Sequence, residues 1–202
     1  KMDDCLAKID VSAKHLLSLV NDVLDMTKLE RDTFTLESKP FNLDRVCIEA
    51  AEIVCFQAES AGLHVEEEHP DVRNVNLLGS ELYLKKILLN LFSNCIKYNK
   101  PGGAIYTRMR ELEHTDDTVT YEFFIRDTGV GMTQDFIDNH LFEAFTQGDN
   151  AARSQYGGTG LGMSIVAQLG KKRNGTIQVE STGGEGSSVT GVLPVAIDHD
   201  PR

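Results

Sequence analysis

The chain has 202 residues, 41% of them hydrophobic, which is enough for one substantial domain plus an appendage and argues against general disorder. Its net charge of −11 argues against binding to nucleic acid or to an anionic membrane, because both surfaces attract a basic patch. No apolar run approaches the ~20 residues that cross a bilayer, and no signal-peptide pattern opens the chain. These features predict a cytoplasmic protein, and they leave open whether a longer parent is anchored in a membrane.

Cysteine spacing predicts neither a zinc site nor a disulfide framework. The four cysteines are far apart and fall in segments with a helical pattern, so we expect small buried apolar side chains in a reducing compartment. They are Cys5, Cys47, Cys55 and Cys95.

A segment without glycine or proline opens the chain, from Asp3 to about Glu30. Its apolar residues recur at spacings of three and four, which predicts a bundle helix about 40 Å long. Such a helix needs a partner, either the rest of this chain or a helix outside it, and its abrupt start suggests a fragment of a longer protein. The apolar positions are Leu6, Ile9, Ala13, Leu16, Val20 and Val23, and Leu17 and Leu24 widen the stripe.

Short strands and one helix are predicted next. The stretch "TFTLESKPFNL" alternates like two short strands separated by Pro40. Leu43 to Ala61 has a helical pattern that ends at Gly62, a residue suited to helix termination. Two further strands are expected at 63–69 and 74–78.

The second half of the chain mixes helices with hairpin-like strands. Ser80 is a candidate N-cap for a helix that runs to about Tyr98. A "PGG" turn at 101–103, β-rich runs at 104–112 and 118–127, a helix at 161–172 and strands at 176–181 and 187–195 follow. This order predicts an α+β fold, with a mixed sheet and helices on one face.

The helix after Ser80 carries a polar side at the edge of its apolar stripe. Asn90, Asn94, Lys97 and Tyr98 fall within an arc of about 100° on a helical wheel. Burying two asparagines without partners would cost about 1 to 3 kcal/mol each, so they either bond nearby backbone or bind a ligand. The adjacent apolar stripe consists of Leu84, Ile87, Leu91 and Cys95.

Two glycine-rich stretches follow, and each alone is a weak signal. "RDTGVGM", residues 126–132, places an aspartate and close-approaching glycine backbone at the end of a predicted strand. "YGGTGLGMSIV", residues 156–166, runs into a helix whose free amides favour phosphate. The second stretch lacks the preceding strand of a dinucleotide site and the Gly-Lys-Ser/Thr of a Walker loop.

In this order and spacing, the three stretches resemble the ATP-binding domain of two-component sensor histidine kinases, whose Bergerat-type fold is shared with DNA gyrase and MutL. "NLFSNCIKY" is similar to the N box of that family, "DTGVGM" to its first glycine box, "LFEAF" to its F box, and "GGTGLGM" to its second glycine box. "GGEGSSVTGVLP" resembles its closing strand motif. The resemblance implies a GHKL two-layer α/β sandwich.

The resemblance also implies a domain organisation and partners. Residues 1–31 would be the second helix of the dimerisation and phosphotransfer hairpin, 32–198 the catalytic ATP-binding domain, and 199–202 a tail. The parent would form a homodimer through a four-helix bundle and pass phosphate to a response regulator receiver domain. The phospho-accepting histidine is expected upstream of residue 1, so the fragment alone should not autophosphorylate. His15 lacks the acidic neighbour of an acceptor and is interpreted as a bundle-surface residue.

The resemblance assigns the nucleotide contacts residue by residue. Asn94 would coordinate the Mg²⁺ that bridges the ATP phosphates, with Asn90 supporting the same metal region. Lys97 would offer charge to phosphate, and Tyr98 would line the pocket. Asp127 would accept the adenine amino hydrogen. Gly129 and Gly131 would let the backbone approach the adenine ring closely.

Further assignments concern the phosphates and the lid. Phe142 and Phe145 would anchor a lid at 146–157, from which Arg153 reaches the γ-phosphate. Ser188 lies where the family often has a threonine near adenine. The phosphate-binding stretch would comprise Gly158, Thr159, Gly160, Leu161 and Gly162.

Asn90 distinguishes this chain from gyrase-type members, which carry a glutamate at that position to activate water. An amide cannot act as a general base, so the site should hold ATP for transfer to a histidine, with Asn90, Lys97 and Arg153 as the catalytic set. Two alternatives remain: a gyrase- or MutL-type ATPase clamp, and a degenerate module that binds nucleotide or a partner without transfer.

Overall fold

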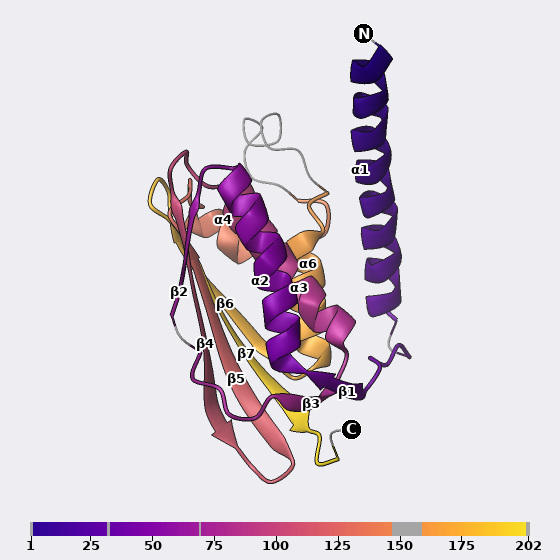
Figure 1. Ribbon diagram of the computed structural model, residues 1–202, viewed down its shortest axis with the longest axis vertical. Helices are drawn as coiled ribbons and strands as arrows, with labels where there is room; N and C mark the ends of the chain where they lie inside the picture. Colours follow the sequence, from indigo (N-terminus) through magenta and orange to yellow (C-terminus); the bar gives the residue numbers. More distant parts are fainter. Residues whose placement is uncertain (1, 32, 69, 147–158, 201–202) are drawn as a thin grey trace.

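A computed structural model describes residues 2–31, 33–68, 70–146 and 159–200 (Figure 1). Helices cover one face of a mixed sheet, and a long helix stands beside this two-layer body. The prediction of an α+β sandwich with helices on one face is therefore confirmed.

The described part contains these helices: α1 (Met2–Leu29), α2 (Leu43–Ser60), α3 (Glu81–Lys97), α4 (Gln134–Asn139) and α6 (Gly162–Lys172). Its strands are β1 (Lys39–Asn42), β2 (His64–Glu67), β3 (Asn76–Gly79), β4 (Ala104–His114), β5 (Thr118–Asp127), β6 (Thr176–Thr182) and β7 (Gly186–Ile197).

The sheet has the order β1-β3-β7-β5-β4-β2, and β6 pairs with β7 as well. Only β2 and β4 are parallel among these pairs. The long central strand β7 pairs with β5 along ten residues, so that Asp127 at the end of β5 lies opposite Ser187. This register brings the first glycine loop and the closing hairpin to the same edge of the sheet.

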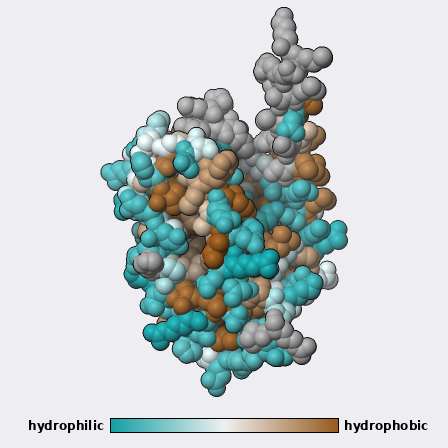
Figure 2. Space-filling model, in the orientation of Figure 1, coloured by the Kyte–Doolittle hydropathy of each residue, from teal (hydrophilic) through white to brown (hydrophobic). Residues whose placement is uncertain are grey.

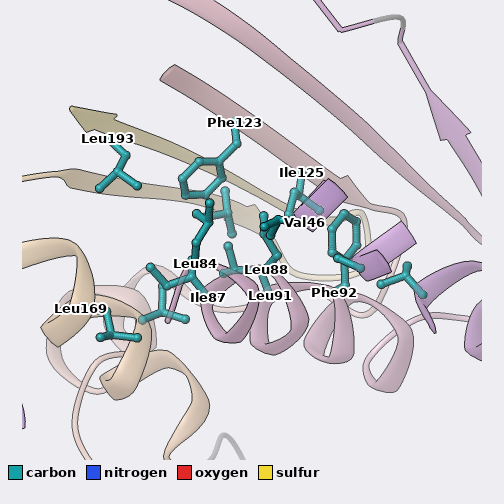
Figure 3. Packing of buried hydrophobic residues seen from close by; sticks show 14 of the residues in the cluster. Val46, Leu84, Ile87, Leu88, Leu91, Phe92, Phe123, Ile125, Leu169 and Leu193 are labelled. Atoms are coloured by element: carbon teal, nitrogen blue, oxygen red, sulfur yellow. The ribbon is translucent and has the colours of Figure 1, made fainter. Parts of the chain in front are cut away.

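The core lies between α2, α3 and α6 on one side and the sheet on the other (Figure 3). Side chains of β5 alternate, with Val119, Tyr121, Phe123 and Ile125 buried toward the helices. Figure 3 shows the apolar side of α3, including Leu91, directed at these residues. Burial of one such side chain contributes about 1.5 to 3 kcal/mol, so this layer fixes how α3 sits on the sheet.

Several local predictions are corrected. Residues 33–38 form no strand, and Pro40 lies inside β1, where its missing N–H is tolerated because β1 is an edge strand. Helix α4 was not predicted, since its six residues are too few to show a period. Cys55 is exposed rather than buried, whereas Cys95 is buried.

Helix α1 confirms the predicted long helix and is buried only near its C-terminal end, within the side chains the structure describes. Met26 and Leu29 join the core, and Lys86 of α3 forms ion pairs with Asp22 and Asp25. The other large apolar side chains of the stripe that the structure describes are exposed, and Figure 2 shows hydrophobic side chains along the coloured part of α1. The exposed members are Ile9, Leu16, Leu17, Val20, Val23 and Leu24.

No helix in the described ranges is both long enough and apolar enough to cross a membrane.

Candidate functional site

The polar edge of α3 faces the beginning of α6. Asn90 is half-buried, and its Nδ2 atom has no hydrogen-bond partner among the described residues. A side chain at Gly162 would place Cβ 3.3 Å from Asn90 Oδ1, a tight contact, so the beginning of α6 lies close against the Asn90 side chain. A buried amide donor without a partner costs about 1 to 3 kcal/mol, which is recovered if a ligand oxygen accepts from it.

The other polar residues of α3 lie one and two turns further along. Asn94, Lys97 and Tyr98 are all half-buried, and Lys97 Nζ lies 4.6 Å from the centre of the Tyr98 ring. The structure thus brings these residues to the same edge of the core as Asn90, as the helical wheel indicates.

Asp127 is the last residue of β5 and is 8% exposed. Its Oδ1 atom accepts hydrogen bonds from the amides of Gly129, at 2.8 Å, and Ser187, at 3.3 Å. Burial raises the pKa of this carboxyl above its ordinary value, although the two amides oppose the shift. A fixed, buried carboxylate of this kind is suited to accept a hydrogen bond from an N–H or O–H group of a ligand.

The glycines after Asp127 allow backbone to approach backbone. A Cβ at Gly129 would lie 2.3 Å from the carbonyl oxygen of Tyr98, and one at Gly131, which has φ +68°, would lie 2.0 Å from that of Thr182. Val130 N donates to the same Tyr98 oxygen at 3.0 Å. The loop is therefore held between the end of α3 and the β6–β7 turn.

Asn99 was not assigned a role from the sequence, yet it supports this loop. It is 7% exposed, and its Oδ1 accepts a hydrogen bond from Thr128 Oγ1 at 3.2 Å. Its Nδ2 donates to the carbonyl of Ala104, whose own amide donates to Thr128 Oγ1. No spacing rule reveals such a residue, because one of its partners, Thr128, lies on a loop 29 residues further along the chain.

The register of β7 does not agree with the assignment of Ser188. Side chains alternate along a strand, and Ser188 lies opposite the exposed residues Arg126 and Glu180. Ser187 shares the face of Asp127 and donates its amide to that carboxylate. Ser188 therefore lies on the face of the sheet opposite to that of Asp127, and its place near adenine stays a prediction.

The start of α6 contacts the F-box segment. Phe145 has φ +64°, and its amide donates to Gly160 O at 3.1 Å. The Leu161 amide donates to Thr159 Oγ1 at 3.0 Å, so a phosphate oxygen would compete with this hydroxyl. Phe142 and Phe145 are exposed. Of the remaining predicted residues, Arg153 and Gly158, like the lid residues 147–157, lie outside the described residues.

Among the described residues, no group of three or more histidine, cysteine, aspartate or glutamate side chains is placed so that it could hold a metal ion. The amide oxygens of Asn90 and Asn94 instead offer the hard ligands that suit Mg²⁺, which retains several waters.

The arrangement combines a buried carboxylate, a glycine loop that packs closely against neighbouring backbone, and the N-terminus of α6 beside the side-chain amide of Asn90. Fold and site together define a nucleotide-binding domain. A sequence profile for histidine kinase-, DNA gyrase B- and HSP90-like ATPases matches residues 79–197, and the chain belongs to this family.

The chain is similar to sensor histidine kinases along most of its length. The chain is 39% identical over 184 residues to the sensor histidine kinase GacS of Pseudomonas protegens, and 36% identical over 190 residues to the histidine-protein kinase BarA of Escherichia coli. These alignments cover 91% and 92% of the chain, but only 20% of each relative. The chain thus spans about a fifth of these curated relatives.

A solved structure supports the same relationship across both parts of the chain. The crystal structure of full-length ShkA in complex with AMPPNP superimposes with a TM-score of 0.77 at 28% identity, covering 99% of this chain and 40% of that one. The similarity therefore includes α1 as well as the nucleotide-binding domain, which is of the histidine kinase type.

Proposed function

We propose that residues 32–198 bind Mg-ATP and donate its γ-phosphate to a histidine, as the catalytic domain of a cytoplasmic sensor kinase segment, and that residues 1–31 belong to the dimerisation hairpin. The observation that carries this proposal is the buried carboxylate of Asp127, held by two backbone amides, one of them from the glycine loop that follows it.

Recognition of adenine falls to the Asp127 end of the site. The adenine 6-amino group would donate to the carboxylate, whereas guanine presents a carbonyl oxygen there and would be repelled. Gly129 and Gly131 let the loop pack against the backbone of Tyr98 and Thr182, and from there the loop would line the flat ring. The Tyr98 side chain would also line the pocket. A polar group buried without a partner costs several-fold to a hundredfold in affinity, which makes this end selective.

The phosphates fall to the other end, where Asn90 faces Gly162. Asn94 would ligate Mg²⁺, and the unpaired Nδ2 of Asn90 would donate to a phosphate oxygen, while its Oδ1 would support the same metal region. Mg²⁺, when bound, neutralises phosphate charge during transfer. Lys97 and Arg153 would add positive charge, and the amides from Thr159 to Gly162 would hold phosphate oxygens.

Transfer is favoured over hydrolysis by the amide of Asn90. A carboxylate at this position could accept a proton from water, but an amide cannot. Steady release of phosphate from ATP by the isolated chain would support the ATPase alternative instead.

The acceptor and the partners are proposed from α1. Its exposed apolar stripe needs a covering surface, which the first hairpin helix and a second copy would supply in a four-helix bundle of the dimer. That first helix would carry the phospho-accepting histidine, and a receiver domain of a response regulator would take the phosphate from it.

Calorimetric titration of the chain with ATP and GTP, with and without Mg²⁺, tests the nucleotide assignment. We expect ATP to bind, Mg²⁺ to strengthen binding, and GTP to bind at least tenfold more weakly. Equal affinity for both nucleotides would exclude the proposed role of Asp127. Radiolabelled ATP should leave the chain itself unlabelled, and should label an added hairpin that carries the acceptor histidine.

A further inference from the structure

A single hydroxyl group ties together three segments beside Asp127. The Oγ atom of Ser181, on β6, accepts a hydrogen bond from the amide of Met132 at 2.8 Å. It lies 2.9 Å from the carbonyl oxygen of Gly186 and 2.9 Å from Ser187 Oγ. Since a hydroxyl donates once and accepts twice, Ser181 donates to Gly186 and accepts from Met132 and Ser187.

These bonds lead directly to the carboxylate. Ser187, whose hydroxyl is anchored on Ser181, donates its backbone amide to Asp127 Oδ1. Met132 ends the glycine loop whose Gly129 amide donates to the same oxygen. Both backbone donors of Asp127 therefore belong to segments that Ser181 holds.

The geometry leaves little room for adjustment. Gly186 has φ +117°, and a Cβ there would lie 2.1 Å from the carbonyl oxygen of Asp127. The hairpin thus contacts the end of β5 directly, and a shift of Ser187 changes the aim of the amide that orients the carboxylate. Ser181 itself is half-buried and was not among the sequence-predicted site residues.

We propose that Ser181 is a positioning residue that sets the selectivity of the site for purines bearing a 6-amino group, acting through Ser187 and Met132 on Asp127. This rests on the proposed function, because the amino group is that of ATP. A hydrogen bond to the amino group depends on direction, whereas stacking and phosphate contacts do not depend on how the carboxylate is turned. Loss of the Ser181 hydroxyl should therefore weaken one contact and spare the others.

The test compares ATP with purine riboside triphosphate, which lacks the 6-amino group. For Ser181→Ala, we expect the Kd of ATP to rise about fivefold to tenfold, the worth of one hydrogen bond, while the Kd of the analogue changes less than twofold. Ser181→Thr retains the hydroxyl and should bind ATP about as tightly as the wild type. Ser181→Val has the shape of the threonine variant without its hydroxyl and should bind ATP as weakly as Ser181→Ala. Ser60→Ala, which removes an exposed serine hydroxyl on α2, is the matched control.

Equal weakening of both nucleotides by Ser181→Ala would overturn the inference, since it would indicate a general effect on the pocket. So would unchanged ATP affinity. Ser187→Ala, which removes one bond to Ser181 and keeps the backbone amide, should show a smaller shift for ATP alone and provides a second variant if the first fails to fold. Failure of the wild-type chain to bind ATP at all would instead contradict the proposed function.

Discussion

The two ends of the candidate site differ in how fully their polar groups are satisfied. At the adenine end, Asp127 is fixed by two amides, and Asn99 and Ser181 bond the flanking loops. At the phosphate end, the buried Nδ2 of Asn90 has no partner within the described residues. This difference fits the proposal that the base-binding groups are fixed in the folded chain before ATP binds, whereas the phosphate and metal contacts are completed on binding.

The largest effect is expected from replacing Asp127, the proposed hydrogen-bond acceptor at the adenine end. Asp127→Asn keeps an oxygen for the two backbone amides but presents an NH₂ group or a weaker acceptor to the adenine amino group. We expect the Kd of ATP to rise about a hundredfold, about 2.7 kcal/mol, with the fold retained. Fluorescent-nucleotide displacement measures the Kd, and circular dichroism checks the fold. Asp138→Asn, on exposed α4, is the control, and wild-type affinity in Asp127→Asn would refute the preformed adenine end.

The tightness of the adenine loop is tested with Gly131→Ala. The new Cβ would meet Thr182 O at 2.0 Å in a backbone conformation with φ +68°. We expect a loss of at least about 2 kcal/mol in unfolding free energy by urea titration, together with weaker ATP binding.

Gly62→Ala separates backbone strain from steric contact. Gly62 has nearly the same φ, +70°, but open space around its Cβ position, so strain alone should cost about 1 kcal/mol. Equal losses in the two variants would show that the close approach of Gly131 to Thr182 contributes nothing.

The phosphate end is tested with Asn90→Leu. Because the Asn90 amide nitrogen is buried without a partner, an apolar side chain of similar size should leave the melting temperature unchanged or raise it. The Kd of Mg-ATP should rise about tenfold, while that of adenosine stays within twofold. A marked fall in melting temperature would show that Asn90 serves the fold rather than the ligand.

The smallest effect is a pH dependence at the adenine end. Burial raises the pKa of Asp127 above its ordinary value of 3.8, so the carboxyl takes up a proton at a higher pH than an exposed aspartate. ATP affinity should fall as the pH is lowered through this raised pKa, because the protonated group loses acceptor strength. The ratio of ATP to purine riboside triphosphate affinity measures the effect, since phosphate titration cancels.

Stability should respond in the opposite direction. A carboxyl with a raised folded-state pKa binds its proton more tightly when folded, so its contribution to stability is present below 3.8 and is lost as the pH rises through the folded pKa. Urea titrations of the wild type and of Asp127→Asn across that range measure the effect. We expect the difference between their unfolding free energies to grow with pH, because only the wild type must bury an ionised carboxylate. A difference that stays constant with pH would show that burying this carboxylate costs no stability.

The fold was predictable where the period of apolar residues was long. The pattern from Asp3 to Glu30 and the alternation of β5 specify α1 and the central strands, because each needs several turns or residues to bury one face. The prediction of a strand before Pro40 was wrong, because a short alternation of residues does not by itself supply a neighbouring strand to pair with. Helix α4 was not predicted, because its six residues span less than two turns.

The site divides in the same way. Motif spacing identified the family, because its motifs are short and follow one another along the chain. The ligand-binding roles of Asn90, Asn94 and Asp127 stay predictions. Which serine faces Asp127 was decided by the pairing of β5 with β7, and the support from Asn99 and Ser181 by contacts between segments far apart in sequence.

The sequence by itself determined the class of fold, the order of the motifs and the amide at position 90 that argues against hydrolysis. Only the tertiary structure decided which side chains converge on the carboxylate. The physical reason is that hydrogen bonds depend on register and direction. A shift of one residue along β7 exchanges Ser187, whose amide donates to Asp127, for Ser188, which lies opposite Arg126 and Glu180 on the other face of the sheet.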